Sequence, residues 1–193
     1  MKSGKRTRMR LVLFVRKLDS NDSRMSFFSE WIKQFAKHAE HIDIITWQQS
    51  NDADAPTNTT LHILQGGTFK KVLQLQFVLL KTLRNADAMY CHMNPEYTIV
   101  SSPLAFIMRV PIVHWYAHGA VTFRRKLVEV FAKHVVTSSP KGFREPLFNK
   151  KVHIVGQGID TELFLFSNKE ERTDKYLIYV GRISPVKDLE SVI

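Results

Sequence analysis

The feature that most constrains the fold of this 193-residue chain is a regular alternation of short apolar runs with longer segments of helical periodicity. The short runs have the length of strands, and the longer segments place their apolar residues on one helical face. Strands interleaved with helices of this length predict an α/β doubly wound sheet that is largely parallel. The expected strands are 11–15, 41–47, 61–64, 88–91, 112–116, 135–138 and 152–155, and the expected helices are 25–37, 69–83, 97–108, 122–133 and 141–148.

Several of these strands are apolar throughout, as expected when helices cover both faces of a parallel sheet. Pro140 fits the first turn of a short helix. The polar run 167–175 has the composition of a linker, and a new strand is expected from Tyr176. We therefore predict a first domain over residues 1–170, followed by 171–193 as a linker and the start of a second domain.

The composition is that of a globular protein, with 44% hydrophobic and 24% charged residues. The apolar run 11–15 is too short for the core of a signal peptide. The stretch 97–117 approaches the length of a membrane span, but it contains Arg109, His114 and two prolines and divides into a helix and a strand. These patterns predict no transmembrane helix.

A formal net charge of +10 implies attraction to an anionic partner, which can be a phosphorylated ligand, a nucleic acid or the cytoplasmic face of a membrane. The segments 69–81 and 123–131 combine apolar and basic residues at helical spacing. Packing on the sheet with basic residues outward is the simplest interpretation, and a role at a membrane surface is the alternative.

Cys91 is the only cysteine, which excludes an intramolecular disulfide and a cysteine-rich zinc site. A single cysteine also fits a reducing compartment. Its place at the end of an apolar strand favours a small buried side chain over a nucleophile.

Ligands of such sheets bind beyond the carboxyl ends of the strands, where the strand order reverses. The loop 16–23 follows the first expected strand and contains no glycine. Dinucleotide binding needs glycines there for the tight turn and for approach of the pyrophosphate, so an NAD or FAD enzyme is disfavoured.

Two histidines follow neighbouring strands in this region. His118 is the stronger candidate, because Gly119 beside it allows close approach of the backbone to a ligand and a neutral imidazole can orient a hydroxyl or polarise a reacting group. His92 can equally be a structural residue at the start of the following helix. His114 lies inside an apolar strand and is expected to be packed.

The carboxy-terminal segment contains a second candidate site. Gly181 follows an apolar strand, and Arg182 and Lys187 offer two cations near a helix start, which suits a diphosphate or, alternatively, an ordinary basic turn. Asp52 and Asp54 form an Asp-x-Asp pattern, but its polar surroundings favour a solvated loop over a metal site.

Taken in order, several segments resemble the retaining, nucleotide-sugar-dependent glycosyltransferases of family 4, which have the GT-B fold. The resemblance implies two Rossmann-like domains that face each other across a cleft, with this chain as the amino-terminal, acceptor-side half. The segments that carry the resemblance are 27–32, 92–97, 115–118, 155–164 and 180–187.

The resemblance also implies residue roles. Arg182 and Lys187 would bind the donor diphosphate without a metal or other cofactor, and His118 would be the catalytic residue near the transferred sugar. Many members have paired glycines after the first strand, whereas this chain resembles a subset with an aspartate, Asp22.

Further residues of the resembling segments are candidates for the cleft, namely His92, Glu96 and Gly181. The family's paired glutamates belong to the second domain and do not occur by Ile193. We therefore expect residues 1–193 to be inactive alone.

The leading expectation is a hexosyltransferase that acts on a nucleotide sugar and a glycan or lipid-linked acceptor. Its expected location is the cytoplasm, either free or peripheral on the inner face of the membrane. The alternative is a non-catalytic Rossmann-like module whose basic face docks on anionic membrane. No nucleic acid is expected as a partner, because the basic residues lack interleaved exposed aromatics and a recognised motif.

Overall fold

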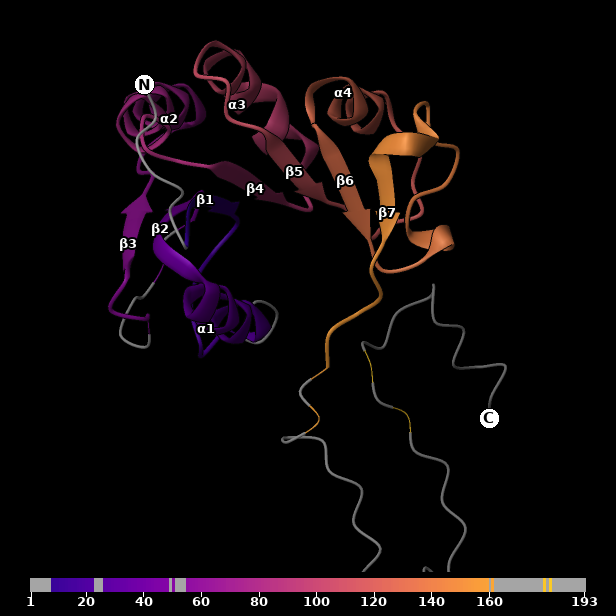
Figure 1. Ribbon diagram of the computed structural model, residues 1–193, viewed down its shortest axis with the longest axis horizontal. Helices are drawn as coiled ribbons and strands as arrows, with labels where there is room; N and C mark the ends of the chain where they lie inside the picture. The colour runs from indigo at the N-terminus through magenta and orange to yellow at the C-terminus, as the bar shows by residue number, and fades with distance from the viewer. Residues whose placement is uncertain are drawn as a thin grey trace, which may run out of the picture. The chain divides into compact units, whose positions relative to one another are not determined.

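The computed structural model describes residues 8–22, 26–48, 50, 55–159, 161, 179 and 181. Its strands form one seven-stranded sheet in the order β3-β2-β1-β4-β5-β6-β7, and all neighbouring strands are parallel (Figure 1). The strands are β1 Met9–Val15, β2 Ala39–Thr46, β3 Thr59–Ile63, β4 Ala88–His92, β5 Ile112–Trp115, β6 His134–Thr137 and β7 Val152–Ile154. The α-helices are α1 Phe27–His38, α2 Thr68–Thr82, α3 Pro95–Ile107 and α4 Phe123–Phe131.

The helices lie on both faces of the sheet, with α2, α3 and α4 on one face and α1 on the other (Figure 1). Side chains of β1 alternate between two hydrophobic cores, because successive residues of a strand point to opposite faces. Phe14 packs with the buried faces of α2, α3 and α4, whereas Leu13 and Val15 pack with Phe28 and Ile32 of α1. Burial on both faces explains why this strand is apolar throughout.

The predicted fold class is confirmed, and the predicted strands and most of the predicted helices overlap those of the structure. The helix predicted over 141–148 is wrong. A short 3₁₀-helix, η1, spans Pro140–Gly142, and a second, η2, spans Asn149–Lys151. Between them Glu145 has φ 50°, and Pro146 after it disfavours the α-helical conformation of the preceding residue.

The loop between the two 3₁₀-helices is held instead by a buried ion pair on α4. Arg125 and Glu129 are both fully buried, and Nη1 of Arg125 donates to Oε1 of Glu129 at 2.9 Å. Nη2 of Arg125 also donates to the carbonyl of Glu145, and Oε2 of Glu129 accepts from the backbone N–H groups of Leu147 and Phe148. The expectation that basic residues of α4 point outward is therefore wrong for Arg125.

The stretch 97–117 divides as predicted into α3 and β5. Arg109, with φ 57°, ends α3 in a Schellman motif, in which the N–H of Val110 donates to the carbonyl of Ala105 and that of Arg109 to the carbonyl of Phe106. Among the described residues, no helix is long and apolar enough to cross a membrane.

The chain divides into two units, residues 1–157 and residues 158–193. The first unit contains the whole sheet and its helices. The domain boundary predicted near residue 170 lies outside the described residues and stays a prediction.

Candidate functional site

The order of the sheet reverses between β1 and β4. β1 pairs with β2 on one side and with β4 on the other, so the loops after these strands diverge at the carboxyl edge. In open α/β sheets this is the position of the ligand crevice. The loops after β1, β4 and β5 are therefore the structural candidates for a binding site.

The loop after β1 contains a compact cluster of charges. Nζ of Lys17 lies 2.9 Å from Oδ2 of Asp19 and 2.8 Å from Oδ2 of Asp22. The hydrogen bond to Lys17 lowers the pKa of Asp19, and the bonds to Asp19 and Asp22 raise the pKa of Lys17. The predicted candidate Asp22 is thus part of an ion-pair cluster at the carboxyl edge, where its carboxylate can accept a hydrogen bond from a ligand hydroxyl.

The turn after β4 is built around Met93, which has the left-handed φ of 64°. This conformation costs a non-glycine residue about 1–2 kcal/mol. The N–H of Met93 donates to the carbonyl of Trp115 at 2.8 Å, and its Sδ accepts from the N–H of Ala117 at 3.4 Å. Met93 therefore joins the loops after β4 and β5, and backbone strain of this kind is concentrated at functional sites.

Sequence reasoning missed Met93. Glycine and asparagine are the residues that signal a left-handed conformation, and methionine does not. The neighbouring Asn94 and Pro95 mark only the start of α3, as its N-cap and first residue.

Glu96 lies in the first turn of α3 and is exposed. Its Oε1 accepts from Nη1 of Arg124 at 2.6 Å, which links the amino-terminal ends of α3 and α4. The next residue, Tyr97, anchors the helix, because its ring stacks on Phe14 of β1 with centroids 3.9 Å apart. Glu96 is thus held at the carboxyl edge by a rigid helix and an ion pair.

His92 ends β4 and is 94% buried, with a relative exposure of 6%. Its ring centroid lies 5.0 Å from that of Phe28 and 5.8 Å from that of Trp31, both on α1. Burial lowers the pKa of His92 to about 4, so the ring is neutral near pH 7. This environment is that of a structural histidine, although the residue ends a strand beside the crevice.

His118 follows β5 and is exposed. Its N–H donates to the carbonyl of Gly142, and its Nδ1 accepts from the N–H of Ala120 at 3.1 Å. Because Nδ1 is an acceptor here, the neutral ring carries its proton on Nε2. The structure thus gives His118 a fixed tautomer with a donor nitrogen for a ligand.

The surroundings of Gly119 explain why this position is a glycine. The explanation is a contact within the protein and differs from the expected approach of a ligand. Its carbonyl accepts from both Nε and Nη2 of Arg144, at 2.8 and 2.6 Å. A Cβ at this position would lie 3.2 Å from Nη2 of Arg144 and 3.3 Å from the carbonyl of Lys141. The glycine therefore allows the loop after β6 to hold the loop that carries His118.

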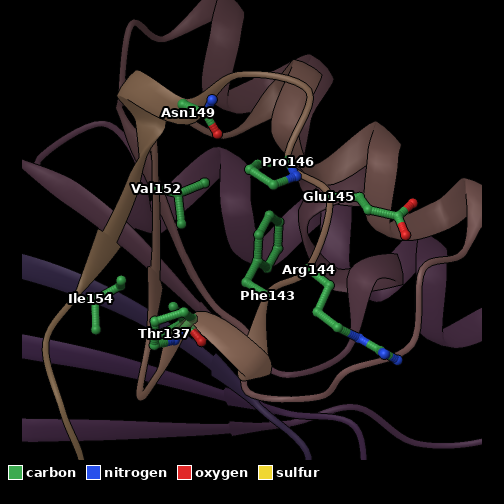
Figure 2. A pocket seen from close by; sticks show the side chains of 9 residues that line it. Thr137, Phe143, Arg144, Glu145, Pro146, Asn149, Val152 and Ile154 are labelled. Atoms are coloured by element: carbon green, nitrogen blue, oxygen red, sulfur yellow. The ribbon is translucent and has the colours of Figure 1, made fainter.

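A cavity of about 420 Å³ lies beside β7 and the loop after β6 (Figure 2). Phe143, Pro146 and Val152 form apolar parts of its lining, and Arg144 and Asn149 contribute polar groups. Nothing in the sequence analysis indicated this cavity, because the predicted helix over 141–148 would replace the loop that forms it.

Two further sequence predictions concern buried groups and are confirmed. Cys91 is fully buried, and burial raises its pKa to about 12. His114 is also fully buried, with Nδ1 at 2.7 Å from Oγ1 of Thr98, and burial lowers its pKa to about 3.

The remaining candidates lie in the second unit or outside the described residues. Gly181 is exposed and belongs to the unit 158–193. Arg182, Lys187 and the Asp52–Asp54 pattern lie outside the described residues. Within the part of the chain that the structure describes, no three histidine, cysteine, aspartate or glutamate side chains form a group that could hold a metal ion.

No family model matches the chain, and a search of curated proteins found no match. Solved structures do resemble it. HepE (Alr3699) of Anabaena, in complex with UDP and glucose, has a TM-score of 0.58 at 13% identity, over 83% of this chain and 47% of that one.

Two other structures are similar. UDP-GlcNAc 2-epimerase of Methanocaldococcus jannaschii has a TM-score of 0.54 at 17% identity, over 77% of this chain and 45% of that one. MurG of Acinetobacter baumannii has a TM-score of 0.54 at 13% identity, over 87% of this chain and 48% of that one. The chain spans about half the length of these proteins. At such identities the likeness shows the fold, which is the Rossmann-like α/β fold of GT-B-type neighbours.

Proposed function

We propose that this chain is the amino-terminal, acceptor-side part of a GT-B glycosyltransferase of the family 4 type. The enzyme moves a hexose from a nucleoside diphosphate sugar to a glycan or lipid-linked acceptor with retention of configuration. The observation that carries the proposal is the reversal of the sheet between β1 and β4, with the exposed His118 and the Asp22 cluster on the loops at that edge.

Similar structures support a uridine nucleotide as the donor. HepE is described in complex with UDP-glucose as well as with UDP and glucose, and the epimerase is named for UDP-GlcNAc. Their likeness to this chain covers 77–83% of it. A UDP-hexose or UDP-N-acetylhexosamine is therefore the first donor to test.

In the proposed reaction, the bond between the anomeric carbon and the diphosphate oxygen breaks, and a bond from that carbon to an acceptor hydroxyl oxygen forms on the same face. The acceptor hydroxyl passes its proton to the departing diphosphate oxygen, on which negative charge develops as its bond to the sugar breaks. Nε2–H of His118 donates a hydrogen bond to the transferred sugar and so positions it. Arg182 and Lys187 stabilise the leaving diphosphate, since fixed cations act most strongly on charge that develops in the transition state.

No metal and no organic cofactor takes part in this proposal. The ion pair between Lys17 and Asp22 keeps a carboxylate at the carboxyl edge, where it can orient an acceptor hydroxyl. Glu96, held by Arg124, is a second carboxylate at the same edge. Replacement of either should raise KM for the acceptor more than it lowers kcat.

The test uses the protein encoded by the native reading frame that contains residues 1–193. It is incubated with UDP-glucose or UDP-GlcNAc labelled in the sugar, together with glycan and lipid extracts, and products are separated and their anomeric configuration is read by NMR. We expect release of UDP and a labelled acceptor with retained configuration. Release of UDP without a labelled acceptor, an inverted product or an epimerised donor would each contradict the proposal.

The residue assignment is tested with a pair of histidine variants. His118→Asn should lower kcat/KM by about 100-fold, the low end of the range for removal of one hydrogen-bond donor that acts at the reacting centre. His38→Asn is the matched control, because His38 is also exposed but lies at the end of α1. Equal activity of the two variants would remove His118 from the proposed site. Sugar transfer by residues 1–193 alone, at the rate of the longer protein, would contradict the need for a second domain.

A further inference from the structure

The outer side of α2 exposes a stripe of large apolar side chains. Phe69 is 79% exposed and Phe77 is 67% exposed, and Leu73 and Leu80 are also exposed. These positions recur every three or four residues, so they lie on one side of the helix. Leu75 and Leu79 occupy the opposite side and are fully buried in the core, so the stripe is not needed for packing on the sheet.

The charge of this helix is of one sign. Residues 68–84 contain no aspartate or glutamate. Lys70 and Lys81 are exposed along the same flank of the stripe, and Arg84 follows the helix and is exposed as well. A helix on the surface of a globular protein usually presents polar groups of both signs on its outer side, whereas α2 presents apolar residues and cations.

The carboxyl ends of the two adjacent helices repeat this combination. Phe106 is 86% exposed and Ile107 is 72% exposed at the end of α3, and the exposed Arg109 follows them. At the end of α4, Phe131 is exposed and Lys133 follows it. Because α2, α3 and α4 lie in one layer and each leads into a strand of the same parallel sheet, their carboxyl ends lie at the same edge (Figure 1).

We propose that this outer surface of α2, α3 and α4 docks on an anionic lipid bilayer. Its members are the α2 stripe (Phe69, Leu73, Phe77 and Leu80) and the exposed ends of α3 and α4, and we call it the α2–α4 surface. The phenylalanine and leucine side chains enter the boundary of the acyl chains, while the lysines and arginines extend to the lipid phosphates. A net charge of +10 attracts the protein to such a surface before the apolar groups insert.

The same charges argue against a second copy of the chain as the occupant. A two-fold contact places the same surface on both partners, so the basic residues Lys70, Lys81 and Arg84 of one copy would meet the same basic surface of the other copy. Like charges placed opposite each other disfavour such a contact. Anionic lipid supplies the opposite charge together with an apolar phase.

The α2–α4 surface is distinct from the candidate site. The exposed ends of α3 and α4 lie at the amino edge of the sheet, and within the α2 stripe Phe69, at the start of α2, is the member that lies toward the carboxyl edge, where His118 and the other loops of the site are. Docking does not rest on the proposed function, because it requires neither a nucleotide sugar nor an acceptor. A result that contradicts membrane docking therefore does not contradict the proposed sugar transfer, and the reverse also holds.

The experiment is flotation of residues 1–193 with vesicles of phosphatidylcholine alone or with about 30% phosphatidylglycerol. We expect the chain to float with the anionic vesicles in low salt and to remain at the bottom with the neutral ones. In 1 M NaCl, where the Debye length is about 3 Å, the floated fraction should fall at least about tenfold. Equal flotation with both vesicles, or none with either, would overturn the proposal.

Variants locate the surface. Phe69→Ser with Phe77→Ser should lower the floated fraction at least about tenfold, and Val155→Ser with Ile159→Ser is the matched control, because both residues are exposed and outside the three helices. Lys70→Glu with Lys81→Glu should also abolish flotation, whereas Lys141→Glu with Lys150→Glu removes two exposed lysines elsewhere and should have a smaller effect. Equal losses in a variant and its control would contradict the assignment.

A second measurement does not depend on the folding of the serine variants. Phe77→Trp keeps an apolar side chain on the stripe. The fluorescence that the introduced tryptophan adds to that of the unsubstituted chain should shift to the blue and be quenched by brominated lipid in anionic vesicles. The fluorescence added by Val155→Trp should show neither change. A single-stranded oligonucleotide serves as the competing polyanion. If the oligonucleotide binds through the same residues and the fluorescence of Phe77→Trp does not respond to vesicles, the surface binds nucleic acid and the lipid proposal is wrong.

Discussion

Removal of the Glu129 carboxylate should destabilise the first unit far more than removal of an exposed glutamate. Glu129 is fully buried and accepts three hydrogen bonds, from Nη1 of Arg125 at 2.9 Å and from the N–H groups of Leu147 and Phe148 at 2.6 and 3.0 Å. The variant Glu129→Leu keeps the apolar volume of the side chain but leaves the guanidinium of Arg125 without a counter-charge.

The size of the loss in unfolding free energy follows from the groups that Glu129→Leu leaves without a partner. Breaking a buried ion pair by removing one partner costs about 3–5 kcal/mol. The two backbone N–H groups of Leu147 and Phe148 form part-buried hydrogen bonds to the same carboxylate, and their loss falls within this range. We expect Glu129→Leu to lower the free energy of unfolding by about 4 kcal/mol, a large share of the 5–15 kcal/mol that is typical of a domain.

The double variant Arg125→Met with Glu129→Leu tests the cause, because it removes both charges. Its loss should be smaller than the sum of the two single losses by about 2 kcal/mol or more. Glu30→Leu is the control, since Glu30 pairs with Lys33 at 2.6 Å on α1 but both side chains are exposed, and it should cost less than about 0.5 kcal/mol. Urea unfolding followed by circular dichroism measures all four values. A loss below about 1 kcal/mol for Glu129→Leu, or additive single losses, would refute the argument.

Three further predictions concern single residues. Arg109→Gly should raise the free energy of unfolding by about 1 kcal/mol in urea titrations, because glycine adopts the left-handed conformation at the end of α3 without strain; a loss of stability would contradict this. Burial lowers the pKa of His92 to about 4, whereas the unfolded value is about 6.5, so the unfolded state binds the extra proton between these values. The contribution of His92 to the free energy of unfolding should therefore be constant above pH 6.5 and fall by about 3 kcal/mol between pH 6.5 and 4. Buried His114, whose pKa is lowered to about 3, adds a loss of its own over the same range, so His92→Phe should reduce the measured fall by about 3 kcal/mol without removing it, and a flat pH profile would contradict both contributions. Because burial raises the pKa of Cys91 to about 12, its labelling by a thiol reagent at pH 8 should be about 1,000-fold slower in the native protein than in urea; fast native labelling would show that this strand opens.

Much of the fold could be predicted because its signals are local. The apolar run of β1 and the helical spacing of α2 are periodic over the length of one element, and alternation of such elements limits the architecture to a doubly wound sheet. The same reasoning placed His118 in a loop at the carboxyl edge, because loops that follow parallel strands gather there. It failed over 141–148, where the backbone is held by side chains of α4 rather than by its own hydrogen bonds.

The sequence by itself therefore determined the order and type of most elements, the parallel sheet and the loops that carry His118 and Asp22. Only the tertiary structure decided which side chains within those elements are buried, paired or strained. Arg125 is buried because the loop 143–148 returns to cover it, and Met93 is held in a left-handed turn by hydrogen bonds to the loop after β5. Phe77 remains exposed because Leu75 and Leu79 already occupy the side of α2 that faces the sheet. Burial depends on contacts between residues that are distant in the chain, and a local pattern does not contain them.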